Sequence, residues 1–255
     1  MTLDALGALS GLPDVQAACD AARSEIDALL WRRDIRSAAA QVAADSRVRG
    51  ARDSAAIDGA DVAVADDSPM GRVLEAAERV TAAVPGQVEA FGRAPLQVLA
   101  HLHALTAVGF CEPDHLGRPR RDDSADDPLL LGNLPTAANV ASRLSLLTDI
   151  LTTPTTAPAL VVAAIAHGEL AVLRPFRWGS GLVARAVVRL VMAERGVDPS
   201  LFSIPEHGYL ELGRSSYVNA LRSYASGTSE GMSQYLVWHA TALAAGARAV
   251  VVSSG

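Results

Sequence analysis

The sequence predicts an all-α protein built around one apolar core. Half of the 255 residues are hydrophobic and only 4% are aromatic, so the core must consist mainly of alanine, leucine and valine, which favours closely packed helices. Apolar residues recur every three to four positions over long segments. No stretch alternates apolar and polar residues convincingly, and no internal repeat is present. We expect residues 1–50 to form an N-terminal helical segment that packs with residues 51–255 as one compact unit.

The first half of the chain contains clear helix boundaries. Asp14 precedes a periodic segment and is a candidate N-cap. Ser68 and Pro69 suit the N-cap and the first turn of a later helix, and the Asp58-Gly59 pair is expected to end an earlier one. The helices expected here cover residues 15–33, 41–57, 68–84 and 95–108.

Residues 112–135 differ in character, since they are rich in proline, glycine, aspartate and arginine. They predict a long surface loop or a short hairpin, and loops of this length are usually functional or disordered. The segment after them that covers residues 157–173 is apolar on nearly all sides, so it is expected to be a buried central helix. The helices expected in this half cover residues 136–151, 157–173, 180–195, 215–225 and 231–250.

Composition also excludes several classes of function. The net charge of −6 argues against general binding to nucleic acid or membrane surfaces. The N-terminus has no basic start, and no run reaches the ~18 apolar residues of a membrane span. Cys19 and Cys111 lack the spacing of metal ligands and are expected to be reduced core thiols. All basic residues are arginine, which indicates the codon bias of a GC-rich genome and, by default, a bacterial cytoplasmic protein.

The stretch LRPFRWGSGLVARAVVRL, residues 173–190, has the features of an anion site. Gly179 and Gly181 let backbone N–H groups approach a ligand, and the following helix directs its unpaired N–H groups to the same place. Arg174 and Arg185 could add forked charged donors. A tight turn between two helices is the alternative interpretation. A dinucleotide site is excluded, because the loop follows a helix and lacks the third glycine.

The same stretch resembles the signature of the Fic (Fido) family, His-x-Phe-x-Asp/Glu-Gly-Asn-Gly-Arg-x-x-Arg, whose members transfer AMP from ATP to protein hydroxyls. Aligned without gaps, the chain has the family's residues at Pro175, Phe176, Gly179, Gly181 and Arg185. The flanks are similar too. His167 precedes the signature at a family position, residues 216–221 resemble a downstream Tyr-x-x-Ala-Leu piece, and residues 112–135 resemble the family's flap. The resemblance implies a Fic-like helical domain over residues 51–255, with the flap above the motif.

A second resemblance lies at Ser54, Asp58 and Gly59, which are similar to the family's inhibitory motif, Ser-x-x-x-Glu-Gly. In relatives the glutamate pairs with the second signature arginine, whose position is Arg185 here. The resemblance implies an ion pair between Asp58 and Arg185, with the shorter aspartate requiring a closer approach or a bridging water. The alternative is a helix that simply ends at a glycine.

The chain departs from the signature at four positions, namely Arg174, Trp178, Ser180 and Leu182. Arg174 replaces the catalytic histidine, and an arginine stays protonated, so it cannot act as a base. Trp178 replaces the acid that holds Mg²⁺, and an indole has no lone pair for a metal. Leu182 removes a phosphate-binding arginine, whereas Ser180 keeps a hydroxyl. The resemblance therefore implies no catalytic residue, no magnesium site, no cofactor and at most weak ATP or phosphate binding.

Three functions stay open. The leading hypothesis is a catalytically inactive Fic-like protein that binds a protein partner, through the flap at 112–135, or an anionic ligand. The alternatives are an enzyme of altered phosphoryl or nucleotidyl transfer that uses Arg174 for phosphate, and a structural protein with an empty pocket. Homodimerisation also stays open. The remaining histidines are poor substitutes for the lost base, and His167 is expected to be structural; the others are His101, His103, His115, His207 and His239.

Overall fold

The computed structural model describes residues 4–252, and every regular element in that range is a helix, which confirms the all-α prediction. The α-helices are α1 (Ala5–Leu9), α2 (Val15–Trp31), α3 (Arg33–Ser37), α4 (Ala39–Ile57), α5 (Pro69–Ala83), α6 (Val88–Phe91), α7 (Pro95–Ala107), α8 (Ala137–Thr152), α9 (Ala159–Leu173), α10 (Ser180–Glu194), α11 (Pro205–Glu211), α12 (Arg214–Ala225) and α13 (Ser229–Arg248). Two short 3-10 helices, η1 (Val84–Gln87) and η2 (Pro113–His115), complete the set. None of the helices in residues 4–252 has the length and apolar character needed to span a membrane.

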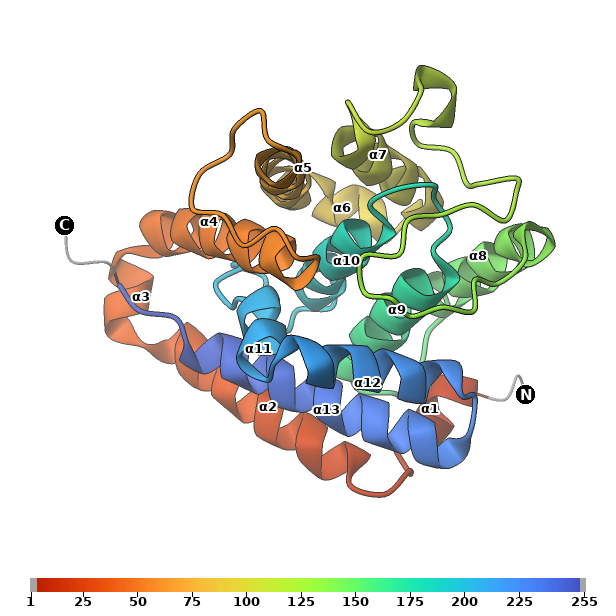
Figure 1. Cartoon of the computed structure of the whole chain (residues 1–255). Coiled ribbons are helices and arrows are strands. Elements are labelled where there is room, and N and C mark those ends of the chain that lie inside the picture. The colour runs from red at the N-terminus through yellow and green to blue at the C-terminus, as the bar shows by residue number, and fades with distance from the viewer. Residues whose placement is uncertain (1–3, 253–255) are drawn as a thin grey trace.

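The helices α9 and α10 pack against each other in the middle of the molecule (Figure 1). Between Ser180 and Ala193, every residue of α10 except Gly181 is buried. In Figure 1, α4, α5 and α7 cover one side of this pair and α11, α12 and α13 cover the other. A helix surrounded on all sides must be apolar on all faces, so the lack of an amphipathic pattern in α9 correctly predicted its place.

The N-terminal helices are integrated with the rest of the chain. The buried stripe of α2, which includes Cys19 and Ile26, packs against α13 near the C-terminus. One continuous apolar core contains buried side chains from Leu6 to Val250. The division at residues 50 and 51 falls inside α4, so the backbone has no break there. Cys19 is buried and Cys111 is half-buried, and both are free thiols.

Two of the expected helix ends are made as predicted and one is not. The Ser68 hydroxyl accepts a hydrogen bond from the Gly71 N–H at 3.0 Å, and Pro69 opens α5. Gly59 has a φ of 95° and closes α4, because the next N–H, of Ala60, bonds back to the Ala55 carbonyl at 2.9 Å. Asp14 does precede α2 as predicted, but its side chain makes no capping hydrogen bond and its backbone is left-handed (φ 61°).

The flap, residues 112–135, contains no strand, so the hairpin alternative does not occur. Its backbone is nevertheless fixed to the motif loop, residues 174–179. The N–H of Arg120 donates to the Pro175 carbonyl, and the N–H of Asp126 donates to the Arg177 carbonyl, both at 2.8 Å. The buried guanidinium of Arg120 also donates to the Arg174 carbonyl at 2.8 Å. The flap therefore lies directly over the motif loop, as the resemblance implies.

Candidate functional site

The motif loop is a tight turn that stabilises itself. Gly179 has a φ of 75°, and a Cβ there would lie 2.8 Å from Cγ2 of Thr106, so both the backbone and the packing require glycine. The Ser180 hydroxyl accepts from the Phe176 N–H at 3.2 Å and donates to the Phe176 carbonyl at 3.3 Å. The hydroxyl that was a candidate for ligand binding is thus buried and bonded within the loop.

The loop is packed between aromatic rings. Phe176 stacks on His103 from α7 with 3.9 Å between ring centroids, and Trp178 stacks on Phe110 at 3.6 Å. Nδ1 of His103 accepts the Gly117 N–H at 3.0 Å, which ties the flap to the same place. Burial lowers the pKa of His103 to about 4, so the ring is neutral near pH 7. His103 supports the loop, a role that its place on another predicted helix did not suggest.

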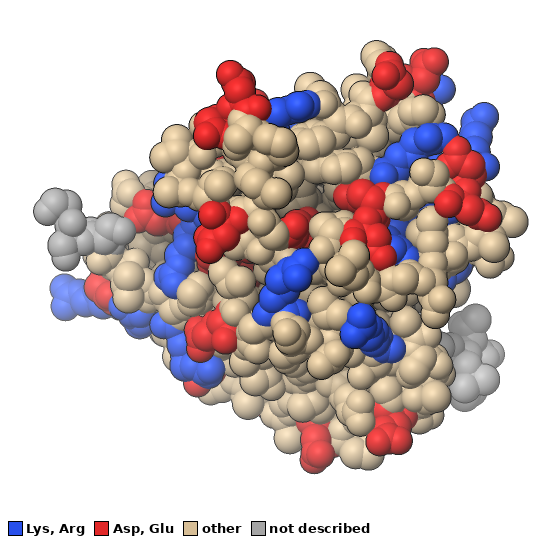
Figure 2. All heavy atoms as spheres, viewed as in Figure 1, with Lys and Arg blue, Asp and Glu red and all other residues tan. Residues whose placement is uncertain are grey.

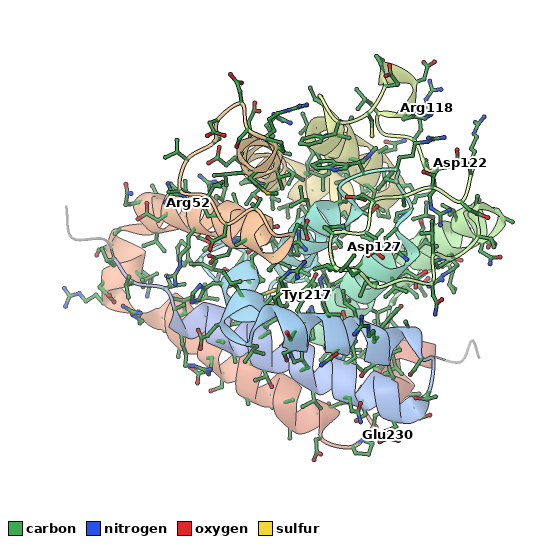
Figure 3. All side chains as sticks on the ribbon, in the orientation of Figure 1. Arg52, Arg118, Asp122, Asp127, Tyr217 and Glu230 are labelled. Carbon is green, nitrogen blue, oxygen red and sulfur yellow. The ribbon has the colours of Figure 1, made fainter. Side chains whose placement is uncertain are left out.

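Arg174 joins the loop to the flap. It ends α9 in the left-handed region (φ 46°), which is unusual for a residue with a side chain. Its guanidinium is almost fully buried and pairs with Oδ2 of Asp127 at 2.8 Å, and it also donates to the Gly132 carbonyl. Figure 3 shows Asp127 near the centre of the molecule and Arg118 at the outer edge of the flap. Arg174, which stands where the Fic signature has histidine, therefore fixes the flap to the end of α9.

Arg185 is fully buried and bonded on all three of its guanidinium nitrogens. Its side chain is 0% exposed and that of Asp58 is 7% exposed, and Nη2 lies 2.7 Å from Asp58 Oδ2. Nε donates to the Ser54 hydroxyl at 2.7 Å, and Nη2 donates to the Ser54 carbonyl at 3.1 Å. Burial alone would lower the pKa of Arg185, but the charges and hydrogen bonds of Asp58 and Tyr217 together outweigh it and raise the pKa. The predicted ion pair is confirmed, and aspartate makes it directly.

Asp126 occupies the start of α10. Its Oδ2 accepts the Gly179 N–H at 3.1 Å, in the place where the sequence predicted an anionic ligand. The pKa of Asp126 is raised to about 7, chiefly by burial and also by the charge of Asp58, while the Gly179 N–H and Arg174 oppose the rise. No motif in the sequence points to Asp126, so this contact was not predicted.

The predicted anion site is therefore brought together but filled with carboxylates. Asp58, Asp126 and Asp127 line the small space beside Ser180 and Gly181, and the cavity left there is about 20 Å³. Oδ1 of Asp58 faces no hydrogen-bond donor within the described residues. The space suits about one water molecule. Each charged donor predicted for the site, Arg174 and Arg185, already has an internal carboxylate partner.

His167 is a core residue. Its Nε2 is 2.8 Å from the Tyr217 hydroxyl and its Nδ1 is 2.9 Å from the Tyr235 hydroxyl, and no part of the ring is exposed. Burial, together with the neighbouring His239 and Arg185, lowers its pKa well below the usual value. The structural role expected for His167 is confirmed. The Tyr217 hydroxyl also accepts from Nη1 of Arg185 at 3.4 Å, so the histidine indirectly supports the ion pair.

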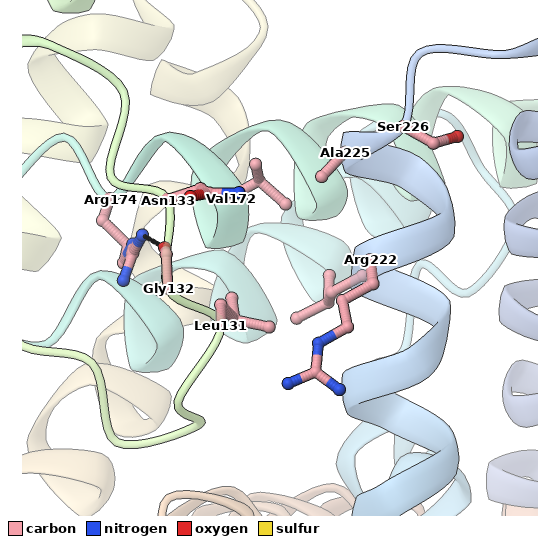
Figure 4. Close-up of a pocket in the computed structure, with 9 residues that line it drawn as sticks. Leu131, Gly132, Asn133, Val172, Arg174, Arg222, Ala225 and Ser226 are labelled. Carbon is pink, nitrogen blue, oxygen red and sulfur yellow. Dashed lines mark hydrogen bonds between the residues drawn. The ribbon is translucent and has the colours of Figure 1, made fainter.

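A larger pocket lies next to the filled site (Figure 4). It has a volume of about 310 Å³ and lies between residues 131–133 of the flap, the end of α9 and the C-terminal half of α12. Arg174 and Arg222 line it from two sides, and in Figure 4 the Arg222 side chain extends from α12 toward Leu131. Nε of Arg174 is buried and has no hydrogen-bond partner within residues 4–252. Sequence reasoning did not identify this pocket, because Arg222 lies far from the motif along the chain.

Comparison with solved structures identifies the fold. A Fic family protein from Desulfovibrio desulfuricans G20 matches with a TM-score of 0.71 at 18% identity, over 92% of this chain and 73% of that one. Fic-1 from C. elegans matches with a TM-score of 0.68 at 16% identity, over 91% of this chain and 71% of that one. A Fic domain-containing signaling protein from Bacteroides thetaiotaomicron VPI-5482 gives 0.54 at 14% identity, over 92% and 100%. No family model and no curated protein matches the sequence. The chain has the Fic fold.

Proposed function

We propose that this Fic-fold chain is a catalytically inactive protein that acts by binding a protein partner, with its own carboxylates in the place of an anionic ligand. The main support is the pairing at the motif loop. Arg174, Arg185 and the Gly179 N–H bond Asp127, Asp58 and Asp126, respectively. A nucleotide phosphate would have to displace all three carboxylates and lift the flap that carries two of them.

The residues around the loop offer no replacement for a general base at a substrate. Such a base must reach the proton that it abstracts and must have a pKa near the working pH. His103 and His167 are buried and have lowered pKa values. Asp126 has a suitable pKa of about 7, but it faces a cavity of about 20 Å³ and is bonded to Gly179. An enzyme of altered transfer chemistry would therefore have Asp126 as its one candidate base among the described residues near the loop, and the cavity beside Asp126 is too small for a substrate.

Binding of a small anionic ligand is the second candidate function, and the pocket of Figure 4 supports it. Within the described residues, Arg174 Nε lacks a hydrogen-bond partner, and the Arg222 side chain makes one hydrogen bond, to the Leu130 carbonyl at 3.2 Å. The Arg222 guanidinium beside 310 Å³ of space can bind a carboxylate or a phosphate through forked hydrogen bonds, and the positive charge of Arg174 on the other side of the pocket favours an anion there. This candidate needs no displacement of Asp58 or Asp126.

A calorimetric titration of the full chain with ATP, ADP and inorganic phosphate, each with and without Mg²⁺, tests whether the motif site is filled and whether the pocket of Figure 4 binds an anion. We expect ATP and ADP to bind with dissociation constants no tighter than ~1 mM, an affinity of about −4 kcal/mol. If phosphate binds in the pocket, Arg222→Ala should weaken it at least tenfold. Arg118→Ala, which removes an exposed flap arginine of equal charge, should not. Micromolar ATP binding that Arg222→Ala leaves unchanged would contradict the proposal that the motif site is filled.

A further inference from the structure

The junction between α2 and α3 presents an unusual surface, remote from the flap. Trp31, the last residue of α2, is 75% exposed, the highest exposure of any tryptophan in the described chain. A groove of about 540 Å³ lies beside it, and the side chains of Leu30, Pro199 and Phe202 contribute to its lining. In Figure 1, α3 lies at the opposite end of the molecule from α8 and the flap.

Two arginines at this surface have no anionic partner. Arg23 pairs with Asp27 and Arg32 pairs with Asp34, so those charges are balanced. In contrast, Arg33 and Arg36 form no ion pair within residues 4–252. Figure 2 shows basic side chains gathered at this end of a chain whose net charge is −6. The local positive charge is therefore a feature of the surface and does not follow from overall composition.

Trp31 and Arg36 are arranged as a preformed pair. The guanidinium carbon of Arg36 lies 5.5 Å from the centroid of the Trp31 ring, within the range of a cation–π contact. This contact holds the guanidinium in place while its N–H groups stay exposed to solvent. Exposed tryptophan and arginine are the residue types most enriched among the energetic centres of protein interfaces.

From this arrangement we propose that the groove beside Trp31 binds a short acidic segment of a partner protein. Its carboxylates pair with Arg36, which lines the groove, and with Arg33, which is exposed on α3 outside the groove lining. An apolar side chain enters between Trp31 and the Pro199–Phe202 side of the groove. Charge complementarity favours this occupant, because guanidinium groups bind carboxylates through two parallel hydrogen bonds. A nucleic acid fits less well, since only two arginines here lack a carboxylate partner and the groove is otherwise lined largely by apolar side chains, whereas a phosphate chain needs an extended row of free cations. The inference rests on the proposed role as a protein-binding chain and names the chemistry of the partner.

Fluorescence anisotropy with labelled hexapeptides tests the proposal. The probe contains three glutamates around a Phe-Pro core, and its control has glutamine in place of each glutamate. We expect the acidic peptide to bind the full chain and the glutamine peptide to bind at least tenfold more weakly. Added salt should lower the affinity of the acidic peptide. Trp31→Ala and Arg36→Ala should each weaken binding at least tenfold. Arg93→Ala, which removes an exposed arginine elsewhere, should leave it unchanged.

Three outcomes would overturn the proposal. The first is that the acidic peptide fails to bind, the second is that the Trp31→Ala protein binds it as tightly as the wild type does, and the third is that an oligothymidylate binds more tightly than the peptide. A Trp31-dependent dimer in sedimentation would assign the surface to a second copy of the chain. Because Trp31 is exposed, its alanine variant should keep the wild-type unfolding temperature, which separates lost binding from lost folding. The assay contains neither ATP nor ADP and probes a surface remote from the motif loop, so failure of this proposal and failure of the proposed function are distinguishable.

Discussion

Replacing Asp58 by alanine is expected to lower the free energy of unfolding by about 2–3 kcal/mol. The substitution leaves Arg185, which has no exposed surface, as a buried cation without a carboxylate. Removing one partner of a buried ion pair costs ~3–5 kcal/mol in other proteins. We expect a cost at or slightly below the lower end of this range for Asp58→Ala, because Ser54 and Tyr217 still accept hydrogen bonds from the Arg185 guanidinium. Urea unfolding of the two proteins measures the difference.

A matched surface pair provides the control for this experiment. Arg93 and Glu89 form an exposed ion pair one helical turn apart, so Glu89→Ala should cost less than ~0.5 kcal/mol. Asp58→Asn separates the two contributions of the carboxylate, since asparagine keeps an acceptor oxygen and loses the charge. The free energy of unfolding of Asp58→Asn should lie between those of the wild type and Asp58→Ala. An Asp58→Ala protein as stable as the Glu89→Ala protein would mean that the contact does not link α4 to α10.

Asp126→Asn is expected to stabilise the protein at alkaline pH and to change little at acid pH. The folded-state pKa of Asp126 is raised from the ordinary 3.8 to about 7, so the folded state binds this proton more tightly than the unfolded state does. The stability from that proton is present below pH ~4 and is lost as the pH rises from about 4 to about 7. At pH 8 the wild type must bury a carboxylate, whereas asparagine accepts the Gly179 N–H without charge.

The expected gain of Asp126→Asn over wild type grows by about 1–3 kcal/mol between pH 4 and pH 8. A shift of about three pKa units would give ~4 kcal/mol if the site were rigid, and we expect relaxation of the flap to reduce this. Urea unfolding at both pH values measures it. The exposed flap residue Asp114 serves as the control, since Asp114→Asn should leave the pH dependence unchanged. A constant difference between Asp126→Asn and wild type would show that Asp126 is not buried in this way.

The sequence predicted most of the fold because its signals are local. The apolar periodicity of α2 and α7 and the uniformly apolar α9 depend only on nearby residues. The Asp58–Arg185 contact was accessible through the resemblance to an inhibitory motif, although 127 positions separate the two residues. Its stabilising effect stays a prediction.

Contacts without a motif could not be predicted. Arg189 and Glu206 form a fully buried ion pair at 2.7 Å, and Arg189 also bonds Ser46 of α4. An arginine on a helix without a polar face indicates a buried charge, and a buried charge needs a partner. Nothing in the sequence identified Glu206 as the partner of Arg189. The contacts of Asp126 and Asp127 depend in the same way on the path of a 24-residue loop, and no periodic pattern fixes that path.

The central claim, that the motif site is filled by the protein's own carboxylates and transfers no nucleotide, is tested most directly by intact-mass spectrometry after incubation with ATP and Mg²⁺. The wild type and Asp58→Ala are compared, alone and with a mixture of candidate target proteins. We predict no AMP adduct in either case, since Asp58→Ala removes an inhibitory-type contact but supplies neither a base at Arg174 nor a metal ligand at Trp178. An AMP adduct that appears with Asp58→Ala and disappears after a second substitution in the motif loop would contradict the account.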